Sequence, residues 1–175
     1  MSHQEQVNFF TNVFNKHKDK FIDKNIIEIG SLIINGSLRD IFLQPKSYLG
    51  VDIGAGLGVD LISRGHEVEF PNDSFDVALS AECFEHDQHW VQTFQKMIDL
   101  VKPKGMIVFS CATTGRAEHG TLATDAGSSP FTINYYRNLT QDDFEKHFDF
   151  DDLFVEYGFG VDPNHHDLYF WGQVS

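Results

Sequence analysis

The segment "ECFEH" at residues 82–86 places two carboxylates and an imidazole close together in the chain. Glu82, Glu85 and His86 are spaced so that one helical turn would bring their side chains onto one face. Such a set suits a divalent cation, because Mg²⁺ takes oxygen ligands and Mn²⁺ or Zn²⁺ also take imidazole. A neutral His86 also suits the role of general base. A purely structural role is the third interpretation, and the residues alone do not choose among the three.

Apolar segments that alternate with amphipathic ones must position these side chains. We expect strands at residues 25–30, 47–53, 59–63, 74–82 and 106–112, and helices at 5–22, 36–45, 89–101 and 140–148. Residues 153–162 and 166–174 are expected as two final strands, joined too tightly for a helical crossover and therefore antiparallel. The sequence predicts an α/β fold: a mostly parallel sheet with helices on both faces and an antiparallel C-terminal hairpin strand.

The length of 175 residues suits a single domain spanning 1–175. Within it, an N-terminal helix is expected in residues 1–24, ahead of the sheet. Residues 113–139 are rich in Gly, Ser and Thr and lack periodicity, and a loop this long in a compact domain is usually functional. We expect this loop to act as a lid.

Composition narrows the classes of partner. The formal net charge of −13 disfavours binding to a phosphate backbone, so no nucleic acid partner is expected. Cys83 and Cys111 lie in apolar runs, which predicts core thiols in a reducing compartment. No secretory signal and no apolar run of membrane-spanning length is visible, so we expect a cytoplasmic protein without a membrane partner.

Acidic residues follow several of the predicted strands. Glu28, Asp52 and Glu82 lie at predicted carboxyl ends, as does the loop that follows Cys111. In open α/β sheets, ligands bind outside these ends, where the strand order reverses. We therefore expect these residues to line one cleft.

The order of these motifs resembles that of class I S-adenosylmethionine-dependent methyltransferases over residues 24–175. The resemblance is carried by "EIGS", "GVDIG", "FPNDSFDVALSAECFEH", "LVKPKGMIVFS" and the closing hairpin. It implies a Rossmann-like fold, S-adenosylmethionine as cofactor and a small-molecule acceptor such as a metabolite, sugar or lipid precursor. The sequence departs from the pattern in three places: the first motif lacks its second glycine, Lys104 replaces a glycine, and the second and third strands lack a helix between them.

The resemblance also implies a cofactor site. Asp52 matches the acid that binds both ribose hydroxyls, and its two oxygens suit a vicinal diol; capping of the next turn is the alternative. Because only "GAGLGV" separates Asp52 from Asp60, either Asp60 or the "GHE" around His66 is expected to contact adenine. The full expected set is Glu28, Gly30, Ser31, Asp52, Ile53, Asp60, His66, Glu67, Ala81 and Glu82.

The Glu-x-x-Glu-His spacing resembles that of small-RNA 2′-O-methyltransferases, which bind metal through it and a later histidine. By this resemblance His119 is a fourth metal ligand beside Glu82, Glu85 and His86, for Mg, Mn or Zn. It also implies that Glu85, His86 and His119 act on the acceptor, where a metal would lower the pKa of a substrate hydroxyl.

Other functions stay open beside this one. A non-catalytic cofactor-binding module and an interaction protein on a decayed methyltransferase fold both fit the shortened second unit. A nicotinamide oxidoreductase is disfavoured, because its diphosphate needs the missing glycines. His165 and His166 are interpreted as surface residues of a turn. The sequence does not determine the acceptor or the oligomeric state.

Overall fold

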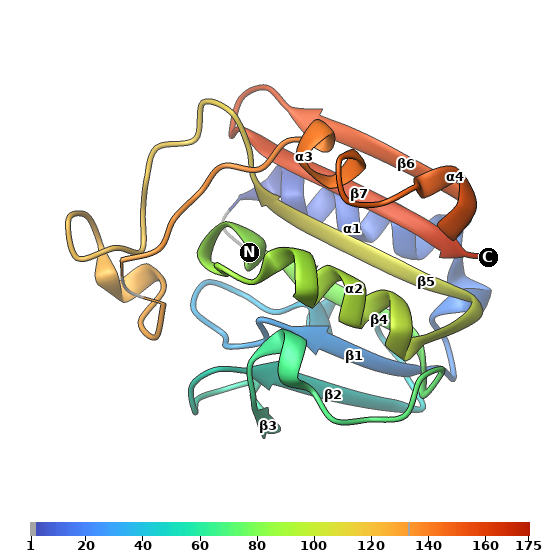
Figure 1. The fold of residues 1–175 in the computed structure, drawn as a ribbon. Helices are drawn as coiled ribbons and strands as arrows, with labels where there is room; N and C mark the ends of the chain where they lie inside the picture. Colours follow the sequence, from blue (N-terminus) through green and yellow to red (C-terminus); the bar gives the residue numbers. More distant parts are fainter. Residues whose placement is uncertain (1–2, 133) are drawn as a thin grey trace.

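The computed structural model describes residues 3–132 and 134–175. These residues form a seven-stranded sheet with the order β3-β2-β1-β4-β5-β7-β6 (Figure 1). Strands β1 to β5 pair in parallel, and β7 lies antiparallel between β5 and β6. This topology confirms the predicted fold class. The strands are β1 Asn25–Ile29, β2 Ser47–Asp52, β3 Leu61–Ile62, β4 Phe75–Ala81, β5 Val101–Ala112, β6 Phe154–Asp162 and β7 Asp167–Val174.

Helices cover both faces of the sheet. Helix α1, Gln4–Lys16, packs on one face, where its Phe10 and Val13 meet strand residues of β1, β4 and β5. The opposite face carries α2, Trp90–Leu100, with α3, Gln141–Glu145, and α4, Phe150–Leu153 (Figure 1). Single 3₁₀ turns complete the structure: η1 Lys18–Lys20, η2 Leu38–Asp40, η3 Gly65–Glu67, η4 Phe84–His86 and η5 Ala126–Ser128.

Phenylalanine dominates the core on the α2 face. Phe94 of α2 is fully buried and packs edge-to-face on Phe109 of β5 and on Phe144 of α3. Such pairs add to the hydrophobic gain from burial. Many of the 17 phenylalanines of the chain fill this core. No helix of the described residues is both long and apolar enough to cross a bilayer.

The predicted helix at residues 36–45 was wrong. The structure has only the turn η2 there, capped by Ser37, whose hydroxyl accepts the Arg39 N–H. Tertiary contacts override helical periodicity, because Leu38 and Phe42 are buried under α1 while Arg39 lies over the Tyr48 ring.

Three other boundaries also differ from the predictions. The N-terminal helix ends at Lys16 rather than at residue 22, and β3 has only two residues. Strand β5 already begins at Val101, because "KPKG" continues the strand through an irregular register rather than breaking it. Lys104 adopts a left-handed φ of 66°, so it keeps the backbone conformation that a glycine would favour there.

Candidate functional site

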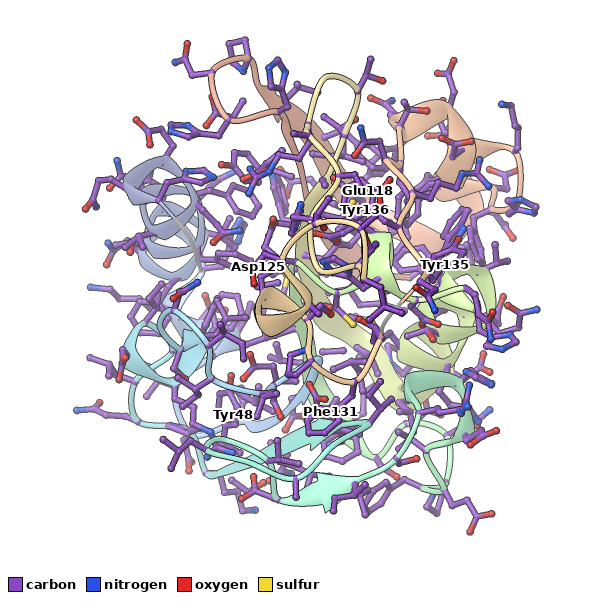
Figure 2. All side chains as sticks on the ribbon, turned by 90° about the vertical axis from the view of Figure 1, so that its left-hand side faces the viewer. Tyr48, Glu118, Asp125, Phe131, Tyr135 and Tyr136 are labelled. Atoms are coloured by element: carbon purple, nitrogen blue, oxygen red, sulfur yellow. The ribbon has the colours of Figure 1, made fainter. Side chains whose placement is uncertain are left out.

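A cavity of about 940 Å³ opens at the carboxyl ends of β1, β2 and β4. Residues 117–119, 125, 128–132 and 135 of the long loop contribute its outer wall. Figure 2 looks onto this side of the molecule, where the loop passes in front of the sheet and carries Glu118, Asp125, Phe131 and Tyr135. The cavity lies where the strand order reverses between β1 and its two neighbours, β2 and β4.

The first loop, "EIGSLIINGS", forms one wall of the cavity. Gly30 has a left-handed φ of 79°, and a Cβ added there would lie 2.6 Å from the Cys83 Cβ. Only glycine therefore lets β1 and the end of β4 approach this closely. Beyond it, Leu32 and Ile34 line the cavity. The loop needs no second early glycine, because its backbone turns back over the end of β2, where the Ser31 N–H bonds to the Val51 carbonyl.

Asp52 ends β2 and faces the cavity. Its two carboxylate oxygens accept the backbone N–H groups of Leu32, at 3.1 Å, and Gly54, at 3.3 Å. Burial raises the pKa of Asp52, and these backbone hydrogen bonds oppose the rise. The carboxylate is held in place with lone pairs left on both oxygens, as recognition of a vicinal diol requires.

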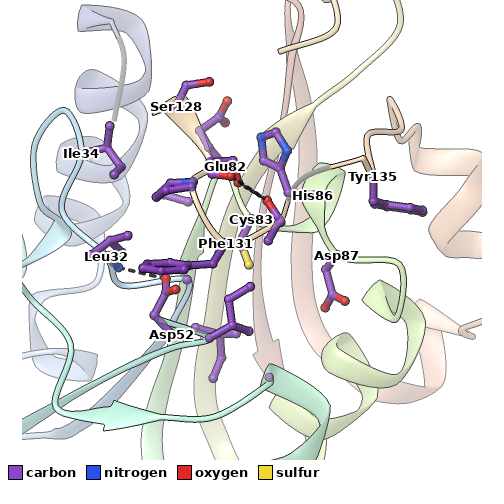
Figure 3. A pocket seen from close by; sticks show the side chains of 18 of the residues that line it. Leu32, Ile34, Asp52, Glu82, Cys83, His86, Asp87, Ser128, Phe131 and Tyr135 are labelled. Atoms are coloured by element: carbon purple, nitrogen blue, oxygen red, sulfur yellow. Dashed lines mark hydrogen bonds between the residues drawn. The ribbon is translucent and has the colours of Figure 1, made fainter. Parts of the chain in front are cut away.

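Phe131 from the long loop reaches the same part of the cavity. In Figure 3 its ring lies close to Leu32 and Asp52, and a Cβ added to Gly54 would be 2.0 Å from that ring. Sequence reasoning missed Phe131, because its loop has no periodicity to indicate which side chains point inward. The only usable signal was a large aromatic residue within a long Gly- and Ser-rich segment.

A second group of polar side chains lies at the other end of the cavity. The turn η4 presents His86, whose Nε2 is 3.3 Å from Nε2 of His119. The His119 Nδ1 in turn contacts the Ala117 carbonyl at 3.1 Å. Glu85 completes the group, with ligand atoms of all three residues within 4.8 Å of one another. The predicted convergence of "ECFEH" with His119 is thus present in part.

Electrostatics make this group unusual. Glu85 is fully buried, and neither of its oxygens has a hydrogen-bond partner among the described residues. Burial, reinforced by the nearby Glu82 charge, raises the Glu85 pKa well above its ordinary value. Burial, reinforced by His119, lowers the His86 pKa to about 4. At neutral pH the group therefore offers a neutral imidazole, and burial favours the protonated form of the Glu85 carboxyl group.

Glu82 lies apart from that group although it lines the cavity. Its backbone is left-handed, with φ of 52°, which turns the side chain toward the α1 face. There its Oε1 accepts Gln6 Nε2 at 2.8 Å and the Ser110 hydroxyl at 3.0 Å. Its Oε2 lies 4.0 Å from the Arg116 guanidinium. Burial, and next the Asp167 charge, raises the pKa of Glu82.

The expected site residues divide between the cavity and its supports. The cavity is lined by eight of them: Gly30, Asp52, Ile53, His66, Ala81, Glu82, His86 and His119. Glu28, Ser31, Asp60, Glu67 and Glu85 do not line it. Asp60 instead pairs with Arg39 and accepts the Gly50 N–H, and Glu28 accepts the Tyr48 hydroxyl at 2.6 Å. Ser63, Arg64 and Gly65 line the wall beside His66.

Residues 46–109 match the family model described as "Methyltransferase domain". A search of curated protein sequences finds no match. Among solved structures, the chain is similar to the 1,6-didemethyltoxoflavin-N1-methyltransferase of Burkholderia thailandensis, solved with bound 1,6-didemethyltoxoflavin and S-adenosylhomocysteine (TM-score 0.65, 16% identity, 95% of this chain and 76% of that one). It is also similar to the N-methyltransferase NodS of Bradyrhizobium japonicum WM9, with a TM-score of 0.59 and 13% identity over 97% of this chain and 96% of that one.

A third similar structure is the CurJ carbon methyltransferase, with a TM-score of 0.66 and 19% identity. The alignment covers 95% of this chain but only 54% of that one. At these identities the solved structures show a shared fold, while the family model covers the segment from just before β2 into β5. The chain therefore contains a segment that matches a methyltransferase domain model, within a Rossmann-like fold that it shares with solved methyltransferases.

Proposed function

We propose that this protein transfers a methyl group from S-adenosylmethionine to a small-molecule acceptor. The observation that carries the proposal is Asp52, held by two backbone N–H groups at the end of β2 inside the cavity at the strand-order reversal. This is the place where an open α/β sheet binds its ligand. The cavity volume of about 940 Å³ lies in the range of small-molecule sites.

In this proposal the cofactor occupies the β1–β2 side of the cavity. Asp52 binds the ribose hydroxyls, while Ile53 and His66 lie at the adenine end. Gly30 and Ala81 allow the methionine part to approach the backbone between β1 and β4. Asp60 and Glu67 support the wall rather than touch the cofactor, since neither lines the cavity.

The acceptor then binds on the His86 side, beneath the long loop. The sulfonium methyl is already electrophilic, so the protein mainly aligns the acceptor nucleophile and excludes water. The nucleophile forms a bond to the methyl carbon while the carbon–sulfur bond breaks, and its proton leaves to a neutral imidazole or to solvent. His86 and His119 face this space with unprotonated nitrogens, because burial lowers the pKa of both.

Glu85, His86 and His119 also fit a divalent cation. The unpartnered oxygens of the fully buried Glu85 are the observation that supports this fit, since buried polar atoms normally have partners. Three protein ligands leave a position open for substrate, and a bound Zn²⁺ or Mn²⁺ would lower the pKa of an acceptor hydroxyl. We extend the proposal to metal assistance at these three residues. Glu82 is left out, because its Oε1 is already engaged.

The test is calorimetric titration of S-adenosylhomocysteine into the wild type and Asp52→Ala. Loss of two hydrogen bonds to a charged acceptor should weaken binding by about 100-fold. Asp40→Ala, an exposed acid of η2, is the charge-matched control and should bind normally. Equal affinity of Asp52→Ala and wild type would contradict the proposed cofactor site.

A second measurement separates an enzyme from a binding module. The full-length protein is incubated with S-adenosylmethionine and a panel of small hydroxyl, amine and carbon acids, with and without a chelator, and release of S-adenosylhomocysteine is followed. Turnover that falls in Glu85→Gln and on chelation supports metal assistance. Turnover unaffected by both treatments rules the metal out. Tight binding without turnover on any acceptor favours the non-catalytic alternative.

A further inference from the structure

A second cluster of histidine and carboxylate side chains lies outside the cavity, between the start of α1 and the β6–β7 hairpin. His3 precedes α1, Glu5 lies in its first turn, Asp162 ends β6, and His165 belongs to the turn between β6 and β7. One ligand atom of each residue lies within 4.8 Å of the corresponding atoms of the other three. None of the four lines the cavity.

The distances within this cluster match those around a tetrahedral metal ion. Nδ1 of His3 is 3.4 Å from Glu5 Oε2 and 4.0 Å from Asp162 Oδ2. Nδ1 of His165 is 3.5 Å from Glu5 Oε2 and 2.8 Å from Asp162 Oδ2. Zinc bonds of the usual length separate tetrahedral ligand atoms by about 3.3 Å. These four separations lie within about 0.7 Å of that value.

The ring of His3 is oriented for metal binding by groups outside the cluster. Its Nε2 lies 2.5 Å from Oδ2 of Asp167, which is fully buried and also accepts Arg116 Nη1 at 3.0 Å. Because Asp167 accepts a hydrogen bond from the Nε2 proton, Nδ1 is the unprotonated nitrogen. It accepts the Gln6 N–H at the start of α1 and lies beside Glu5 and Asp162. Metal-bound histidines are held in this way, by a carboxylate on the other ring nitrogen.

Three of the four converging atoms are acceptors. Within the cluster only one proton is shared, which His165 donates to Asp162 Oδ2, and from outside it His3 Nδ1 accepts the Gln6 backbone N–H at 3.3 Å. The His3 and His165 rings are stacked, with centroids 3.9 Å apart and an interplanar angle of 9°, so their in-plane lone pairs run parallel. The partly exposed His165 ring must therefore rotate out of the stack to share an ion with His3. A divalent cation would satisfy all four atoms in place of that single proton.

We propose that His3, Glu5, Asp162 and His165 form a structural zinc site that fastens α1 to the β6–β7 hairpin. Two imidazoles with two carboxylates favour Zn²⁺ over Mg²⁺ or Ca²⁺, which take oxygen ligands. Four protein ligands close the coordination sphere, as in structural rather than catalytic sites. The inference does not depend on the proposed methyl transfer.

The test uses the full-length protein, stripped with a chelator and titrated with Zn²⁺ alone against a chromophoric competitor. We expect one equivalent to bind here and to raise Tm, because the ion binds the folded state. Glu5→Gln and His165→Gln should each weaken this equivalent at least tenfold. Glu5 is half-exposed on the first turn of α1, so its variant should keep the fold, which circular dichroism checks.

Two controls locate the bound ion. His166→Gln changes the neighbour of His165, which is outside the cluster, and should bind Zn²⁺ like wild type. His119→Gln removes the histidine of the cavity group and should also keep this equivalent. Retention of every wild-type zinc equivalent in both Glu5→Gln and His165→Gln, or loss of zinc binding only in His119→Gln, would overturn the proposal, as would no binding at all.

Discussion

Asp167 and Glu85 are both fully buried carboxyl groups, yet their surroundings are opposite. Asp167, at the start of β7, lies 2.5 Å from Nε2 of His3 and 3.0 Å from Nη1 of Arg116. Glu85, in η4, has no hydrogen-bond partner for either oxygen among the described residues. One carboxylate is held by two charged or polar donors, and the other lies buried beside the Glu82 carboxyl group without such a donor.

The comparison distinguishes a buried carboxyl group that stabilises the fold from one that is available to a ligand. A buried charge is tolerated when donors replace its lost hydration. Asp167 meets that condition and joins the N-terminal segment to β7 and to the long loop. Glu85 does not, so it is either protonated or bound to something the chain itself does not supply.

The largest effect should come from breaking the satisfied group. Asp167→Ala leaves Arg116 and His3 without their buried acceptor, and we expect unfolding free energy to fall by about 3–5 kcal/mol. Urea denaturation measures it. Asp151→Ala, an exposed acid that accepts the Tyr157 hydroxyl, should stay within about 0.5 kcal/mol of wild type. A loss below about 1 kcal/mol for Asp167→Ala would mean that its partners contribute little.

Glu28 lies between these two cases, because it has one side-chain donor, the Tyr48 hydroxyl, at 2.6 Å. The pH dependence of stability tests how well one donor satisfies it. Burial raises the pKa of Glu28 from 4.5 to about 7. The folded state therefore binds a proton between pH 4.5 and 7 that the unfolded state has lost, so stability falls as pH rises through this range. The full loss attributable to Glu28 is about 3 kcal/mol.

Glu28→Gln should remove this part of the slope. The amide keeps an acceptor for Tyr48 and never ionises, so its stability relative to wild type should grow from pH 5 to pH 8. Denaturation at each pH measures the difference. Parallel curves for the two proteins would show that Glu28 titrates normally, and that its single partner suffices to hold the charge.

The smallest effect should come from the unsatisfied group. Glu85→Met replaces unpartnered oxygens by apolar atoms of similar size, and we expect a gain of about 1–2 kcal/mol in metal-free protein, with loss of any metal-dependent turnover. Glu82→Met is the matched contrast, because Glu82 accepts Gln6 and Ser110 and its loss should destabilise. Destabilisation by both variants would mean that Glu85 is satisfied in the folded protein.

Much of the fold could be predicted from short-range pattern. The apolar segments of β1, β2 and β4 and the amphipathic helix α2 appear close to their expected positions, because their periodicity reports burial in a sheet or on one helix face. The helix expected at 36–45 failed for the complementary reason. Its apolar residues are anchored individually by α1 and β2, which no local pattern records.

Some residues of the candidate site could likewise be predicted from the sequence, and others could not. That Asp52 and Glu82 line one cavity follows from strand ends, since carboxyl ends of parallel strands share one edge, whereas Glu28, expected there by the same argument, does not line it. The inward direction of Phe131 and the exclusion of Asp60 do not follow. They depend on how a long loop and a shortened connection pack in three dimensions.

The sequence by itself determined which strands form and which acidic residues end them, because both follow from the order and spacing of neighbouring residues in the chain. Only the tertiary structure decided which buried acids are satisfied. Asp167 meets His3 across 164 positions and Arg116 across 51, and Glu85 meets neither. Hydration lost on burial is replaced only by groups that folding brings from elsewhere in the chain, so the cost or benefit of each carboxylate exists only in the folded molecule.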